Sequence, residues 1–173
     1  MMPPRILVAC IGNIFLGDDG FGVEVANRLA PRISPQQVSV KDFGIRGFDL
    51  AYALMDPYDL TILVDACARG GAPGTVYLIE PDPIDEATLN SNPARMEAHG
   101  MNPMNVLRLV KSLGGEPGRV VIVGCEPADL GSDEDGKMGL SEPVMAAVDD
   151  AIAMIEELIA KCFAGEPVGA GNS

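Results

Sequence analysis

The chain has 173 residues, 47% of them hydrophobic and 21% charged, a balance that suits a globular fold with a substantial core. Its formal net charge is −13, from 25 acidic and 12 basic residues, so we expect no binding to nucleic acid or to an anionic membrane surface. No apolar run reaches the roughly 18–20 residues that cross a bilayer, and the N-terminus lacks the features of a signal peptide. We therefore expect one cytoplasmic domain over residues 1–173, with a core of about 5–163 and a flexible tail over 164–173.

Short apolar runs bounded by turn residues predict five strands. In chain order these are residues 6–11, 38–40, 60–64, 75–79 and 119–124. A short turn at 70–74 joins the third strand to the fourth, which is therefore expected as an antiparallel strand at an edge.

Helical periodicity lies between these runs. It predicts helices at 21–29, 48–55 and 103–113, and a last helix that begins at Ser141. Pro31 ends the first helix, and Asn102 with Pro103 forms an N-cap and first helical residue for the third. The polar, proline-bearing stretch 81–99 is predicted as a long loop, with a short helix near 85–89.

Strands that alternate with helices predict an α/β fold. We expect a three-layer sandwich in which a five-stranded, mostly parallel sheet carries helices on both faces, with one antiparallel edge strand. In such folds ligands bind beyond the carboxyl ends of the strands. Asp18 and Asp19 follow the first strand and Asp65 ends the third, so these acids would face one crevice if the two strands are neighbours.

The glycine-rich turn after the first strand, GNIFLGDDGFG, reads as the entry to a helix. One of its two acids, Asp18 or Asp19, can cap that helix, which leaves the other free. The glycine order is the reverse of a dinucleotide fingerprint and a P-loop lysine is absent, while two acids would repel a phosphate. The turn therefore does not predict a nucleotide site.

A metal site is one alternative for the free acid. Asp19, Asp65 and the only histidine, His99, come from separate loops, and their oxygen and imidazole groups suit zinc or nickel with coordination positions left open. A single histidine is more often a surface or packing residue, and an aspartate after a strand is often a turn former. The residue pattern alone leaves both interpretations open.

Other chemistries have weaker support in the sequence. The acidic loop at 126–139 resembles an EF-hand only in part, because glycine stands at the first ligand position. No G-x-S-x-G motif is present. The four cysteines, none in a C-x-x-C pair, are predicted as buried free thiols: Cys10, Cys67, Cys125 and Cys162.

Five segments in order resemble the motifs of the nickel–iron hydrogenase maturation endopeptidases, over about residues 5–160. ILVACIGNIFLGDDGFG is similar to the family's opening motif, and DFGIRGFDL is similar to its D-x-G-x-x-G segment. LVDACARGGAPGTVYLIE resembles its third-strand aspartate and P-G-T turn. VIVGCEPADL and GLSEPV resemble its last strand and the start of its last helix.

The resemblance implies an endopeptidase that removes the C-terminal extension of a nickel–iron hydrogenase large-subunit precursor after nickel insertion. Matched residue by residue, the family's metal-contacting and catalytic triad is Asp19, Asp65 and His99, although 81–98 matches the family poorly before His99. Asp18 then becomes the cap or turn residue. The partner is the precursor, and the enzyme itself is expected to be a monomer.

The resemblance also favours nickel carried by the substrate as a recognition device, with a metal-free resting enzyme. Two other mechanisms stay open: a metal on the triad that activates water, or a carboxylate that acts as general base. Two other functions also stay open. One is a chaperone that binds the same precursor without cutting it, and the other is a peptidase of this fold with another protein substrate.

Overall fold

The structure is a computed structural model that describes residues 2–82, 103–131 and 136–169. Several sequence predictions lie outside these residues: the short helix near 85–89, His99, the N-cap Asn102, and most of the acidic part of the EF-hand-like loop.

Five strands form one mixed sheet in the order β2-β1-β3-β5-β4. The strands are β1 (Ile6–Ile11), β2 (Val38–Gly44), β3 (Leu60–Ala66), β4 (Val76–Ile79) and β5 (Arg119–Cys125). All neighbouring pairs are parallel except β4 and β5, which are antiparallel. The mostly parallel sheet and the antiparallel edge strand are thus confirmed. The partner of β4 is β5, because β5 pairs with β3 along seven residues and fills the position beside it.

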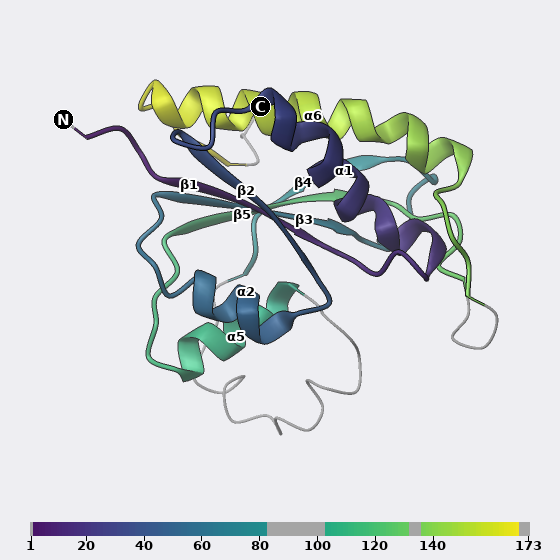
Figure 1. The fold of residues 1–173 in the computed structure, drawn as a ribbon, viewed down its shortest axis with the longest axis horizontal. Coiled ribbons are helices and arrows are strands. Elements are labelled where there is room, and N and C mark those ends of the chain that lie inside the picture. The colour runs from purple at the N-terminus through teal and green to yellow at the C-terminus, as the bar shows by residue number, and fades with distance from the viewer. Residues whose placement is uncertain (1, 83–102, 132–135, 170–173) are drawn as a thin grey trace.

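Helices cover both faces of the sheet, as predicted (Figure 1). The described α-helices are α1 (Phe21–Leu29), α2 (Gly47–Ala53), α5 (Pro103–Ser112) and α6 (Glu142–Phe163). Helices α1 and α6 pack on one face, and α2 and α5 pack on the other. None of the helices in the described part of the chain is both long and apolar enough to cross a membrane.

Strand β1 shows how the sequence produces two cores. All six of its residues are buried, and successive side chains point to opposite faces of a sheet. Ile6, Val8 and Cys10 pack in the core beneath α1 and α6. Leu7, Ala9 and Ile11 belong to the core beneath α2 and α5. A continuous apolar run is therefore what a central strand of this sandwich requires.

Two strands run further toward their carboxyl ends than their apolar runs indicated. Strand β2 continues past residue 40 to Gly44, and β3 continues past residue 64 to Ala66. Backbone pairing accounts for the difference, because a strand ladder accepts polar residues: Asp42 is paired with Cys10 on β1, and Asp65 with Gly124 on β5. Asp65 is thus part of the strand, and its pairing with β5 fixes its position.

The helix boundaries differ by small amounts from the prediction. Helix α2 ends two residues earlier than predicted, and α1 ends at Leu29, followed by a 3₁₀ turn at Ala30–Arg32 that contains Pro31. Ser141 is the N-cap residue of α6, as predicted. All four cysteines are free, but only two are buried, because Cys67 and Cys162 are half-buried at the ends of their elements.

Candidate active site

Asp19 and Asp65 lie at the carboxyl edge of the sheet, beyond two neighbouring strands. Asp65 is the penultimate residue of β3 and is only 6% exposed. Asp19 lies in the 3₁₀ helix η1 (Gly17–Gly20), between β1 and α1, and is partly buried. Because β1 and β3 pair directly, the two acids share one region, as their positions in the sequence predicted.

The environment of both carboxyl groups disfavours their ionisation. Burial raises the pKa of Asp65 well above its ordinary range, and the charge of Asp19 raises it further. Burial also raises the pKa of Asp19, while the backbone N–H of Asn13, 2.9 Å from its Oδ2, acts in the opposite direction. A buried pair of like charges is stabilised by a bound cation or by a shared proton. The pair is therefore suited to cation binding and to proton transfer.

Backbone contacts between the β1 and β2 ends fix the loop that holds Asp19. The carbonyl oxygen of Asp19 would lie 2.0 Å from a Cβ placed on Gly12, so only glycine fits there. The N–H of Gly12 donates to the carbonyl of Gly44 at 3.0 Å. Asp42 in turn accepts from the N–H of Gly44 at 2.8 Å, which explains the D-x-G spacing of this segment. Two sequence motifs thus join to position one acid.

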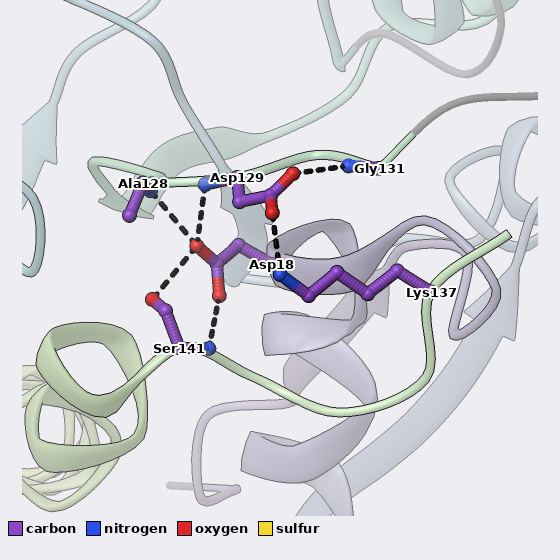
Figure 2. A network of polar contacts seen from close by, with 6 residues as sticks. All are labelled: Asp18, Ala128, Asp129, Gly131, Lys137 and Ser141. Atoms are coloured by element: carbon purple, nitrogen blue, oxygen red, sulfur yellow. Dashed lines mark hydrogen bonds and ion pairs between the residues drawn. The ribbon is translucent and has the colours of Figure 1, made fainter. Parts of the chain in front are cut away.

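Asp18 is fully buried and acts as an anchor between distant segments (Figure 2). Its Oδ2 accepts hydrogen bonds from the N–H groups of Ala128 and Asp129, at 2.8 and 2.9 Å, and from the Ser141 hydroxyl at 2.8 Å. Its Oδ1 accepts from the N–H of Ser141 at 2.7 Å. Burial raises the pKa of Asp18, but these hydrogen bonds outweigh it, and the net shift is downward.

Asp18 was predicted as the cap or turn residue: it does lie in the 3₁₀ turn, but the alternative that it caps the following helix is wrong. No side chain caps η1 or α1, and Gly20 occupies the N-cap position of α1. The carboxylate points instead toward donors on the loop after β5 and at the start of α6, which offer four hydrogen bonds rather than one. An ion pair between Lys137 and Asp129 adds to this connection (Figure 2).

Glu126 is a further buried acid that the sequence analysis did not assign. It follows β5, is 6% exposed, and accepts hydrogen bonds from the N–H groups of Arg69 and Gly70 and from the Tyr77 hydroxyl. These bonds lower its pKa, the Arg69 N–H most of all. Glu126 therefore holds the loop that follows Asp65. An acid directly after a buried parallel strand was the signal that could have found it.

Nucleophilic chemistry by the nearby thiol does not fit this environment. Cys67 is two residues from Asp65, and burial together with the Asp65 charge raises the pKa of its thiol to about 12. A thiol with such a pKa is protonated near neutral pH and is a poor nucleophile. The Cys67 thiol is therefore not suited to act as a nucleophile here.

Asp19 and Asp65 fit a metal ion by their chemistry, since carboxylate oxygens are metal ligands and the pair concentrates negative charge. Within residues 2–82, 103–131 and 136–169, no group of three or more His, Cys, Asp or Glu side chains could hold a metal ion. The third predicted ligand, His99, lies outside those residues.

Comparison with known proteins decides the family. A family model described as hydrogenase maturation protease matches residues 23–158. The chain belongs to the hydrogenase maturation protease family. It is 36% identical over 159 residues to a putative hydrogenase maturation protease of Methanocaldococcus jannaschii, covering 90% of this chain and 96% of that protein.

Solved structures agree with this assignment. The hydrogenase maturating endopeptidase HybD of Escherichia coli has a TM-score of 0.68 and 28% identity, with coverage of 98% of this chain and 99% of that one. The [NiFe] hydrogenase maturation protease HycI of Thermococcus kodakarensis has a TM-score of 0.65 and 27% identity, with coverage of 91% and 94%. The protein is thus a hydrogenase maturation endopeptidase that processes the C-terminus of a hydrogenase large subunit.

Proposed function

We propose that this maturation protease recognises nickel already inserted into the large-subunit precursor, through Asp19, Asp65 and His99. The observation that carries the proposal is the carboxyl pair, two neighbouring acids whose pKa values are raised by burial and, for Asp65, by the charge of Asp19. A cation brought by the substrate relieves this repulsion, so binding of a loaded precursor is favoured over binding of an empty one. His99 enters by its match to the family's histidine.

Asp65 is also the residue best placed to handle a proton during hydrolysis. A carboxyl group with a raised pKa accepts a proton from an attacking water more readily near neutral pH than an ordinary aspartate does. Asp19 keeps its orientation through the Asn13 N–H and lies beside Asp65 as the second oxygen ligand. In this proposal the peptide bond next to the nickel site lies against the pair, and the bound cation positions it.

The experiment compares cleavage of a nickel-loaded and a nickel-free precursor by mass spectrometry of the released C-terminal peptide. The wild-type enzyme is expected to cleave the loaded precursor only. Asp19→Asn, Asp65→Asn and His99→Ala should each lose cleavage. Asp56→Asn, an exposed acid between α2 and β3, is the matched control and should cleave normally.

Two results would contradict the proposal. Normal processing by all three site variants would show that these three residues are not the site. Equal cleavage of loaded and nickel-free precursor would be consistent with a peptidase at this site but would show that the enzyme does not recognise nickel.

A further inference from the structure

Six large apolar side chains are exposed on three segments at the carboxyl edge of the sheet. Between 40% and 66% of each residue is accessible, and together we call them the apolar face: Ile14, Phe15, Ile45, Phe48, Tyr52 and Met138. They come from the loop after β1, the β2–α2 connection with α2, and the loop before α6.

Backbone hydrogen bonds hold these three segments side by side. The N–H of Gly12 donates to Gly44 at 3.0 Å, which joins the loop after β1 to the end of β2. The N–H of Lys137 donates to the carbonyl of Phe15 at 2.7 Å, which joins the same loop to the segment before α6. The loop at the centre is also the one whose Asn13 N–H contacts the Asp19 carboxylate. The apolar face therefore borders the proposed site.

The side chains on α2 extend the apolar face in one direction. Phe48 and Tyr52 are four residues apart, one helical turn, and so lie on the same side of α2. With the other four residues they expose apolar surface on the order of 600 Å², at the upper end of the range for the largest apolar patch on a typical soluble monomer, which is often functional. Aromatic residues and methionine are also the types enriched in protein interfaces.

We propose that the apolar face is the surface on which the body of the hydrogenase large-subunit precursor docks. The substrate of this enzyme is a protein, and the loop that exposes Ile14 and Phe15 also contacts the Asp19 carboxylate through the Asn13 N–H. A folded partner whose C-terminal segment reaches the carboxyl pair can therefore rest on this part of the edge. Docking there places the C-terminal extension of the precursor at Asp19 and Asp65. The apolar face then supplies most of the binding, and the two carboxyl groups contact only the segment that is cut. The inference rests on the proposed site, because the apolar face is defined by its position beside Asp19.

The test uses Phe15→Ser and Phe48→Ser, two variants on separate elements, in the full-length enzyme. Each is expected to raise KM for the nickel-loaded precursor about tenfold, with kcat unchanged at saturating precursor, and to weaken direct binding by a similar factor. Phe163→Ser is the matched control, because Phe163 is a 37% exposed phenylalanine at the far end of α6, and it should leave both constants unchanged.

The outcomes separate docking from the chemical site. An unchanged KM for both folded variants overturns the proposal, and so does a lower kcat at constant KM. Circular dichroism verifies folding, and if one variant does not fold, the KM of the other decides the question. If Asp19→Asn, Asp65→Asn and His99→Ala all keep full cleavage, the proposed site fails on its own, while direct precursor binding by the two phenylalanine variants still tests the docking surface.

Discussion

Replacing Asp18 with asparagine should destabilise the protein strongly, although the two side chains have nearly the same shape. Asp18 offers two acceptor oxygens to four donors, whereas asparagine offers one oxygen and one NH₂ group. If the NH₂ group replaces Oδ1, it faces the N–H of Ser141; if it replaces Oδ2, it faces three donors. In either orientation at least one buried donor loses its acceptor.

The size of the effect follows from these contacts. A hydrogen bond to a charged group contributes about 1.5–3 kcal/mol, and a buried donor left without an acceptor costs about 1–3 kcal/mol. We therefore expect Asp18→Asn to lower the free energy of unfolding by about 3–5 kcal/mol. At about 2–4 °C per kcal/mol for a chain of this size, Tm should fall by roughly 10 °C.

Urea unfolding followed by circular dichroism at pH 7 measures this loss. Ser141→Ala removes only the hydroxyl hydrogen bond and should cost about 1 kcal/mol. Asp149→Asn, on an exposed position of α6, should change stability by less than about 0.5 kcal/mol. If Asp18→Asn were no more destabilising than Ser141→Ala, the view of Asp18 as the anchor of this loop would be wrong.

The same anchor predicts a dependence on pH. The pKa of Asp18 is lower in the folded protein than in the unfolded chain, so its ionised form stabilises the fold above the ordinary carboxyl pKa of about 3.9. This contribution is lost as the pH falls through the lowered pKa. The stability difference between wild type and Asp18→Asn should therefore shrink below about pH 4.

Three further predictions concern the surroundings of the site. Asp65→Asn should raise the free energy of unfolding at pH 7 by about 1–2 kcal/mol, because it removes a carboxyl group whose pKa is raised on folding. This gain should vanish below about pH 4, where Asp65 is protonated in both the folded and the unfolded state. Urea denaturation at the two pH values tests this. Gly22→Ala should lower the free energy of unfolding by about 3 kcal/mol or prevent folding, because its Cβ would lie 2.2 Å from the carbonyl oxygen of Ile11 on β1. Gly47→Ala is the control: no atom lies within 4 Å of its Cβ, and its stability in the same assay should stay within about 1 kcal/mol of wild type. Glu126→Gln should release the loop at Arg69, and limited trypsin digestion should then cut after Arg69 several-fold faster than in wild type; an unchanged rate would show that Glu126 does not hold this loop.

Much of the fold was predictable because its central strands are buried on both faces. The run 6–11 needs no tertiary information to be recognised as such a strand, and all its residues are indeed buried. The ends of β2 and β3 were less predictable, because both strands continue past their apolar residues. Asp42 and Asp65 belong to the strands through backbone pairing with β1 and β5, which composition does not reveal. The sequence placed Asp19 and Asp65 in one region only on the condition that the first and third strands are neighbours, and the pairing of β1 with β3 meets that condition.

The roles of Asp18 and Glu126 could not be predicted in the same way. Their hydrogen-bond donors are mostly backbone N–H groups, which every residue except proline carries and which leave no signal in a sequence. A cap on the following helix was the nearest local use for Asp18, and the fold overrode it with partners more than a hundred residues away. A sequence pattern indicates contacts between residues that are close in the chain, whereas Asp18 bonds to residues that are distant in it.

The long separation between Asp18 and its partners has a consequence for how the enzyme comes into being. Ser141 is synthesised 123 residues after Asp18, which at about 5–20 residues per second is roughly 6–25 s later. During that interval the first turn can form beside β1 and bond to the end of β2, but the Ser141 donors to Asp18 do not yet exist. A nascent chain that has completed all five strands still lacks the two hydrogen bonds from Ser141 to Asp18, which form only when the last helix begins. The last hydrogen bonds to this buried carboxylate therefore form late in the synthesis of the chain.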